Sequence, residues 1–370
     1  MHKLSFYPLG NADTTLISLE NGKDILFDFA NVADPGDSNE KRAILDKDLR
    51  DYMEGKDKDT FEVAAFSHGD SDHTKGASEF FWLDYAKEYQ GEDRFKIGQL
   101  WVPAAMIVEE GCEDDARVIR QEARYRLLKG SGIQVFSRPE QLKDFLEDNG
   151  LTLEERKHLI TDAGNLAKGP TIIDDGVEFF VHSPFAHRQD EENVIDRNNN
   201  CLVMQATFSV SGKITRLLML ADIKWEPLDE LIGITRYHKR DERLFWDICK
   251  AAHHCSAYSL NKDKGKTKTV PTASIDWLYG QRPNNAIMVC PSDPIPTTDM
   301  DQPPHFQAAN YYKARLEEIV QGRFLVTMCE PSEAKPKKIE IEIGIGGPKR
   351  LLRNAPGGAT LTDRSGPRVG

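Results

Sequence analysis

The sequence predicts an α/β fold built as a layered sandwich. Strand-like runs rich in β-branched and aromatic residues fill residues 4–30 and return after residue 177. Helix-like segments, with apolar residues at helical spacing, follow each block of strands. The chain has 370 residues, 39% of them hydrophobic and 29% charged, which is enough for a well-formed core. Two blocks of strands followed by helices are typical of an α/β sandwich.

The first block opens with three predicted strands. Segments 3–9, 14–20 and 24–30 are separated by turn-like residues, a pattern typical of hairpins. A buried strand is predicted at 61–67, and a helix-like segment follows soon after it. The polar heptapeptide SHGDSDH, residues 67–73, is therefore expected in a loop between a strand and a helix.

Residues 84–165 are predicted to form a charged, mostly helical insertion. Within them, segments 113–130 and 138–150 carry acidic or capping residues early and end in glycine, as helices do. We expect one domain over 1–345 that contains this insertion. The final segment, 346–370, is rich in glycine, proline and arginine and is predicted to be a flexible tail.

Composition excludes some classes of function. The 48 basic and 60 acidic residues give a net charge of −12, which argues against broad electrostatic binding to nucleic acid or anionic membrane. No apolar run approaches the roughly 20 residues that span a bilayer, and the first residues do not resemble a signal peptide. The six cysteines form no CxxC pair and are expected to be reduced thiols. We expect a cytoplasmic protein.

The heptapeptide gathers residues that bind metals. His68 and Asp70 are two apart and project to the same side of an extended segment, while Asp72 and His73 can turn toward a neighbouring point. Asp, Ser and Gly are also ordinary turn residues, and Asp72 could cap the next helix. The heptapeptide alone is therefore compatible with a metal site or with a polar capping loop.

Two later features favour the metal site. The apolar strand LLMLAD ends in Asp222, a residue type that strands disfavour. His253 and His254 follow another apolar stretch. Together with the heptapeptide, these residues predict a metal centre assembled from three parts of the chain.

The order of these segments resembles the metallo-β-lactamase superfamily. More closely, it resembles the hydrolase domain of the DNA-uptake competence protein ComEC and its stand-alone relatives, over roughly residues 4–330. The matching segments are GNADTTLISLENGKDILFDFA (10–30), SHGDSDHTKG (67–76), HSP (182–184) with NNNCLVMQATF (198–208), LLMLADI (217–223) and AAHHCSAYS (251–259). The resemblance implies a four-layer αββα sandwich and a metal-dependent hydrolase.

The resemblance also implies two divalent metal ions, zinc or manganese. The ligands that it implies by position are His68, Asp70, Asp72, His73, Asp222 and His253. The first two would hold one ion, the next two the other, and Asp222 would bridge them, with His253 completing the set. His254 stays open as the alternative to His253, because a pattern does not separate adjacent histidines. Asp70 stands where many members have histidine, which shifts the expected preference toward manganese or a mixed pair.

Further roles follow from the resemblance. Asp28 would orient a ligand histidine, and Asn200 would shape the loop under the site. Two ions about 3.5–4 Å apart would activate a shared water for attack on phosphorus or a carbonyl carbon, and Asp72 would orient that water. His305 matches a histidine that ends the hydrolase region and would approach the scissile group, or else it caps the following helix.

A basic loop follows the histidine pair. Its alternating lysines are Lys262, Lys264, Lys266 and Lys268. So close to the metal site, they would form a cradle for a phosphodiester backbone, although a solvated loop is the simpler interpretation. We therefore expect a phosphodiesterase or nuclease whose substrate is a nucleic acid or nucleotide.

Two other functions stay open. The same metal pair could hydrolyse a small molecule such as a cyclic nucleotide, lactone or thioester, which the net charge favours. Alternatively, the chain is a catalytically weakened binding or sensor module. Three departures from the family pattern motivate that alternative: Asp70, Ala221 in place of glycine in TGD, and Cys255 in place of glycine in HHGS.

Overall fold

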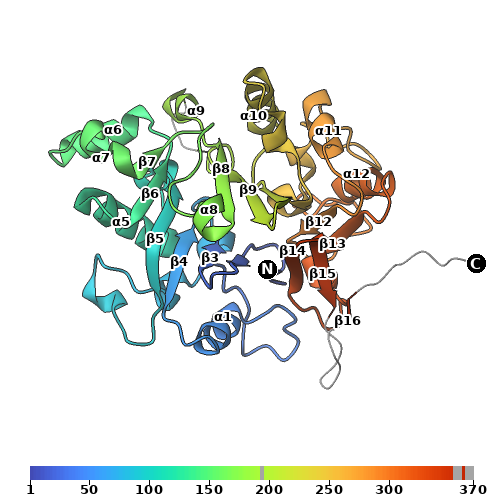
Figure 1. Cartoon of the computed structure of the whole chain (residues 1–370), viewed down its shortest axis with the longest axis horizontal. Helices are drawn as coiled ribbons and strands as arrows, with labels where there is room; N and C mark the ends of the chain where they lie inside the picture. Colours follow the sequence, from blue (N-terminus) through green and yellow to red (C-terminus); the bar gives the residue numbers. More distant parts are fainter. Residues whose placement is uncertain (192–195, 353–360, 363–370) are drawn as a thin grey trace, which may run out of the picture.

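Figure 1 shows the computed structural model, which describes residues 1–191, 196–352 and 361–362. Two β-sheets lie face to face in the middle of the molecule, and helices cover the outer side of each. The predicted four-layer α/β sandwich is confirmed.

The first sheet has ten strands in the order β16-β15-β14-β1-β2-β3-β4-β5-β6-β7. The pairs β1–β2 and β2–β3 are antiparallel, as the hairpin pattern predicts, and β3 to β7 run parallel. Its strands are β1 (His2–Phe6), β2 (Thr15–Ser18), β3 (Asp24–Phe27), β4 (Thr60–Ala65), β5 (Lys96–Pro103), β6 (Ile133–Phe136), β7 (Ile160–Thr161), β14 (Ile339–Gly344), β15 (Gly347–Leu352) and β16 (Leu361–Thr362).

The prediction of a mostly helical insertion over 84–165 needs correction, because it omits three strands. The helices are present, but β5, β6 and β7 alternate with them and extend the sheet in parallel. Strand β6 has four residues and β7 has two, and β5 is uniformly buried only toward its end, so none of them shows an alternation long enough to be distinguished from part of a helix. The helices of this segment are α4 (Ala105–Val108), α5 (Asp114–Lys129), α6 (Glu140–Asp148) and α7 (Leu153–Arg156).

The second sheet has six strands in the order β13-β12-β11-β10-β9-β8. The pairs β8–β9 and β9–β10 are antiparallel, whereas β10 to β13 are parallel. Its strands are β8 (Val177–Ser183), β9 (Val203–Val210), β10 (Lys213–Met219), β11 (Ile248–Lys250), β12 (Ile287–Cys290) and β13 (Arg323–Val326).

The predicted start of a flexible tail at 346 needs correction. Strand β15 pairs with β14, and β16 pairs with β15, so the first sheet continues past residue 345. The other tail residues, 353–360 and 363–370, lie outside the described residues, so the predicted flexibility concerns a part of the chain that is not described.

Three apolar layers hold the sandwich together. Between the sheets, Phe27 and Trp101 from the first pack against Phe179 from the second. Helices α1, α5 and α6 cover the first sheet, and α10, α11 and α12 cover the second. The bounds of the helices not yet given are α1 (Leu45–Glu54), α2 (Ser71–Thr74), α3 (Ala77–Phe80), α8 (Ile172–Asp175), α9 (Ala186–Glu191), α10 (Trp225–Tyr237), α11 (Ala273–Gly280) and α12 (Phe306–Glu317).

Short 3₁₀ turns complete the fold: η1 (Lys87–Tyr89), η2 (Lys157–Leu159), η3 (Asp241–Leu244), η4 (Ala252–Cys255), η5 (Ala257–Ser259) and η6 (Thr327–Cys329). Within the described part of the chain, no helix combines the length and the apolar character needed to cross a bilayer.

Candidate metal centre

Polar side chains gather where parallel strands of both sheets end. Asp28 follows β3, the heptapeptide follows β4, Asp222 follows β10, and His253 and His254 follow β11 in η4. The carboxyl ends of parallel strands share one edge of a sheet, which is where α/β folds place their ligands. The two sheets thus bring distant parts of the sequence to one place.

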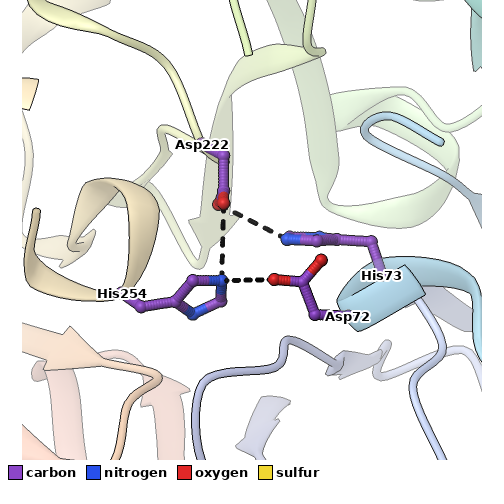
Figure 2. Close-up of side chains that lie close together, drawn as sticks. All are labelled: Asp72, His73, Asp222 and His254. Carbon is purple, nitrogen blue, oxygen red and sulfur yellow. Dashed lines mark ion pairs between the residues drawn. The ribbon is translucent and has the colours of Figure 1, made fainter. Parts of the chain in front are cut away.

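Four of these residues form a compact cluster. Each of Asp72, His73, Asp222 and His254 offers a ligand atom, and these atoms all lie within 4.8 Å of one another. Figure 2 shows Asp222 between the two imidazoles: its Oδ1 lies 3.4 Å from His73 Nε2, and its Oδ2 lies 3.4 Å from His254 Nε2. Asp72 Oδ2 lies 3.3 Å from His254 Nε2. Imidazole nitrogen and carboxylate oxygen are donors that suit zinc and related divalent ions.

The other ring nitrogen of each histidine is already engaged. His73 Nδ1 lies 3.0 Å from Asp28 Oδ2, and His254 Nδ1 lies 2.7 Å from the Pro291 carbonyl oxygen. Asp28 itself accepts a hydrogen bond from the backbone N–H of Ser67. When Nδ1 donates to a carboxylate or carbonyl oxygen, the lone pair is left on Nε2, where a metal binds.

The Nε2 nitrogens of three histidines are available as metal ligands. The Nε2 atoms of His68, His73 and His254 are buried, and within residues 1–191, 196–352 and 361–362 they have no hydrogen-bond partner. A buried polar group left without a partner costs about 1–3 kcal/mol. A metal ion among the carboxylates would satisfy these nitrogens, so the residues present fit a metal.

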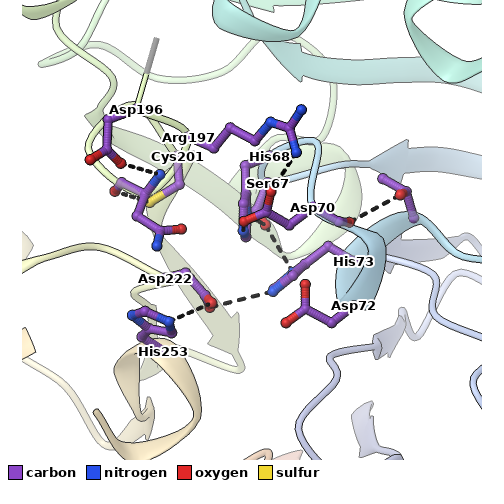
Figure 3. A network of polar contacts seen from close by, with 12 residues as sticks. Ser67, His68, Asp70, Asp72, His73, Asp196, Arg197, Cys201, Asp222 and His253 are labelled. Carbon is purple, nitrogen blue, oxygen red and sulfur yellow. Dashed lines mark hydrogen bonds and ion pairs between the residues drawn. The ribbon is translucent and has the colours of Figure 1, made fainter. Parts of the chain in front are cut away.

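A second, more open group adjoins the first. His68, Asp70 and Asp72 also offer ligand atoms within 4.8 Å of one another, so Asp72 belongs to both groups. His68 Nδ1 lies 3.0 Å from the Ser67 hydroxyl, and its Nε2 lies 3.4 Å from Asp70 Oδ2. The structure therefore brings all four acidic and histidine residues of the heptapeptide to the centre (Figure 3).

Charges control ionisation within the cluster. Burial by itself would raise the pKa of Asp222, but His254 and His73 outweigh it and hold that pKa well below its usual range. Burial by itself would lower the pKa of His254, but Asp222 and Asp72 raise it well above its usual range. The pKa of His73 is raised in the same way, chiefly by Asp28 and Asp222. The carboxylates are thus ionised, and a bound cation would displace protons from the histidines.

His253 and His254 reach Asp222 in different ways. His253 Nε2 lies 3.6 Å from Asp222 Oδ2, and 23% of its side chain is exposed, whereas His254 is buried within the four-residue cluster. Their backbone is unusual: φ is +47° at His253, +49° at His254 and +70° at Cys255. Ala221, next to Asp222, has φ of +47°. Non-glycine residues in the left-handed region store strain, which gathers at functional sites.

His305 and Asn200 are buried and hydrogen-bonded to backbone groups. The His305 ring is fully buried; its Nδ1 accepts from the Ala257 N–H, and its Nε2 lies 3.4 Å from the Asp301 carbonyl oxygen. Both nitrogens are thus engaged by backbone groups outside α12, and the ring makes no capping hydrogen bond to that helix. Asn200 is buried, and its amide donates to the Asp196 carbonyl oxygen at 3.0 Å.

The lysine loop begins shortly after η5 and packs on α12. The Thr267 carbonyl oxygen accepts from the Asn310 amide at 2.8 Å. Lys264 Nζ lies 2.7 Å from Asp299 Oδ1, and this carboxylate partly neutralises its charge. Lys262, Lys266 and Lys268 are exposed.

Two charged residues at the centre are not among the predicted site residues. Arg197 pairs with Asp70, and Lys250, at the end of β11, pairs with Asp13, both nearly fully buried. A charged residue that closes an apolar strand is the signal that reveals Asp222, and the same signal could have found Lys250. Nothing local marks Arg197, because Asp70 is 127 positions away.

No family model matches the chain, and no curated protein matches it. Among solved structures, the fold is similar to a diphosphatase of the PhnP family (9% identity, 92% of this chain and 98% of that chain, TM-score 0.33). It is also similar to the metallo-β-lactamase SMB-1 in complex with mercaptoacetic acid (13%, 67% and 79%, 0.30) and to zinc-bound PqqB from Methylobacterium extorquens (10%, 88% and 97%, 0.35). Likenesses of this degree assign no activity.

Proposed function

We propose that the protein is a metal-dependent hydrolase that uses two divalent ions, zinc or manganese, to cleave phosphodiester bonds in DNA or RNA. The observation that carries this proposal is the set of buried histidine Nε2 atoms that face shared carboxylates and, within the described residues, have no hydrogen-bond partner. Buried charged groups gather where they are paired or bind metals. The segments that resemble the metallo-β-lactamase superfamily and the ComEC hydrolase domain support the same reaction class.

The donor geometry suggests how the ions would be shared. Asp72, His73, Asp222 and His254 would hold one ion, and His68, Asp70 and Asp72 the other. We prefer His254 to His253 as the ligand, the reverse of our expectation from sequence. His254 Nε2 lies within 3.4 Å of two carboxylates and its ring is fixed by Pro291, whereas His253 Nε2 lies 3.6 Å from one carboxylate.

The residues of the chain divide the work. Bound divalent ions would lower the pKa of a water and offset charge on the phosphoryl oxygens. Asp72 belongs to both groups and is partly exposed, so its carboxylate can orient the attacking water and take up its proton. Asp28 and the Pro291 carbonyl oxygen hold Nδ1 of His73 and His254, so that Nε2 is the nitrogen each ring turns toward a metal ion.

The basic loop supports a phosphodiester substrate. Lys262, Lys266 and Lys268 are exposed on a loop a few residues after His254, and such charges attract a phosphate backbone. The net charge of −12 favours the second candidate, hydrolysis of a small molecule such as a cyclic nucleotide, lactone or thioester. Salt separates the two, because a polymer displaces several counterions on binding and a small ester does not.

The test combines metal content with cleavage. Purified wild type, Asp72→Ala and Asp222→Ala would be analysed by inductively coupled plasma mass spectrometry. Each would then be assayed on single- and double-stranded DNA and RNA with zinc, manganese or magnesium. Asp84→Ala is the matched control, because Asp84 is about as exposed as Asp72 but pairs with Lys129.

We expect bound metal and cleavage in wild type and in the control, and loss of both in the two cluster variants. If the protein binds metal and cleaves a small phosphodiester but no polynucleotide, the proposal that its substrate is DNA or RNA is wrong. If wild-type protein takes up no ion after metal is resupplied, the proposal of a metal-dependent hydrolase is wrong.

A further inference from the structure

We propose that Arg197 is a built-in cation that weakens metal binding at the His68–Asp70 half of the centre, so that the ions load in order and the four-residue cluster fills first. The inference rests on the proposed function, because it presumes two ions. Figure 3 shows Arg197 reaching from the segment before β9 toward Asp70, away from Asp222.

The guanidinium of Arg197 is held from three sides. Its Nη1 donates to Asp70 Oδ1 at 2.7 Å, its Nε donates to Glu109 Oε1 at 2.7 Å, and its Nη2 donates to the Gly111 carbonyl oxygen at 3.2 Å. Arginine keeps its charge in proteins, and its planar fork suits such fixed contacts. Arg197 is therefore a permanent positive charge in a defined place.

This charge acts on one half of the centre. One oxygen of Asp70 accepts from Arg197, and the other faces His68 Nε2 at 3.4 Å. A carboxylate that shares its charge with arginine attracts a metal ion less, and the guanidinium repels the ion directly. Among the residues that the structure describes, neither Asp72 nor Asp222 forms an ion pair with arginine or lysine. The permanent cation nearest to them, Lys250, is paired with Asp13 and acts on Asp222 only at longer range.

Glu109 is a second carboxylate partner of Arg197, which allows Asp70 to leave the arginine. Its Oε1 accepts from both Nε and Nη2 of Arg197, so the guanidinium keeps a carboxylate partner even where Asp70 turns to a metal. Only 11% of the Glu109 side chain is exposed, which limits the competition from water. Binding of the second ion would then break the contact between Arg197 and Asp70, whereas binding of the first ion breaks no arginine contact.

The experiment is a titration of metal-free, full-length protein with Mn²⁺, followed by calorimetry, with bound metal checked by mass spectrometry. Wild type is compared with Arg197→Gln, which removes the charge, and with Arg197→Lys, which keeps it. Arg243→Gln is the matched control, because Arg243 has similar exposure and pairs with Glu178. Circular dichroism would show that each variant is folded.

We expect a tight first ion and a weaker second ion in wild type, Arg197→Lys and the control. In Arg197→Gln the second ion should bind about tenfold more tightly, while the first is unchanged. A second affinity that stays the same or falls in Arg197→Gln would overturn the inference, since Arg197 would then position Asp70 as a ligand. One tight ion without a second step in wild type and Arg197→Gln alike would also overturn it and leave the four-residue cluster standing. Absence of any bound ion would refute the proposed function itself.

Discussion

The protein buries histidines in two contrasting ways. In the metal centre, His73 and His254 each have Nδ1 engaged, and their Nε2 atoms lack a hydrogen-bond partner within the described residues. Elsewhere, both nitrogens of His182 and His305 have partners. His182 Nε2 lies 2.9 Å from the Arg243 carbonyl oxygen, and its Nδ1 lies 3.4 Å from the Thr235 hydroxyl. Burial is shared, and buried His2 also has an Nε2 without a hydrogen-bond partner, so what marks the centre is an open nitrogen that belongs to a group of potential metal ligands.

Carboxylates create that difference. Asp222 stands against both centre histidines and raises the pKa of each. His182 has no carboxylate among the influences on its pKa, and burial lowers that pKa to about 4. A histidine with one fixed nitrogen, one open nitrogen and a carboxylate nearby is prepared for a cation, whereas a neutral histidine with two partners is a structural residue.

The largest effect should separate the two adjacent histidines. We expect His254→Ala to weaken binding of the first ion by about 100-fold or more, because a direct ligand should matter at least as much as its supporting residues. His253→Ala should change that affinity only a few-fold, and His182→Ala should leave it unchanged. Competition with a chromophoric chelator measures all three. The reverse order would restore His253 as the ligand.

A smaller loss should follow from removing the charge that supports His73. Asp28→Asn can still accept the Nδ1 proton but loses the negative charge, so we expect metal affinity to fall about 10-fold to 100-fold. Asp247→Asn serves as the control, because Asp247 is a carboxylate that accepts from the Arg216 N–H instead. An affinity equal to that of wild type would mean that shape alone orients His73.

Buried His182 should make the free energy of unfolding depend on pH in the acid range. The pKa of His182 is about 4 when folded because of burial, and about 6.5 when unfolded, so the unfolded chain binds a proton first. Its contribution to the free energy of unfolding is complete above pH 6.5 and is lost as pH falls toward 4, by about 3 kcal/mol. His182→Gln should flatten this part of the urea-unfolding profile. His73 and His254 act in the opposite sense without metal, since raised pKa values favour folding at low pH.

Much of this centre could be predicted from sequence, because several of its residues stand out from the segments directly before them. The heptapeptide follows an apolar strand, and Asp222 breaks another, so composition changes abruptly at both places. The choice between His253 and His254 was not predictable, because positive φ values at both residues decide which ring turns inward. The contact of Arg197 with Asp70 depends on how the two sheets meet.

The fold shows the same division. Hairpins β1 to β3 alternate with clear turns and were predicted, as was the layered architecture. Strands β5 to β7 were missed because β6 and β7 are too short to show a period and β5 has no regular alternation of exposed and buried residues along its whole length. Pairing with β4 makes them strands, and that partner is not visible in their own residues.

The smallest effect concerns the strained backbone that sets Asp222 in place. Ala221 has φ of +47°, a conformation that strains an alanine by about 1–2 kcal/mol but does not strain a glycine. Ala221→Gly should therefore raise the free energy of unfolding by up to about 1 kcal/mol, since the lost methyl contact and the greater freedom of the unfolded chain offset part of the relief. Ala104→Gly is the counterpart, because Ala104 is equally buried but has φ of −57°, and it should destabilise by about 1 kcal/mol. If Ala221→Gly destabilises as much as Ala104→Gly, the backbone beside Asp222 is not strained, and the cluster differs from the other buried histidines through its charges alone.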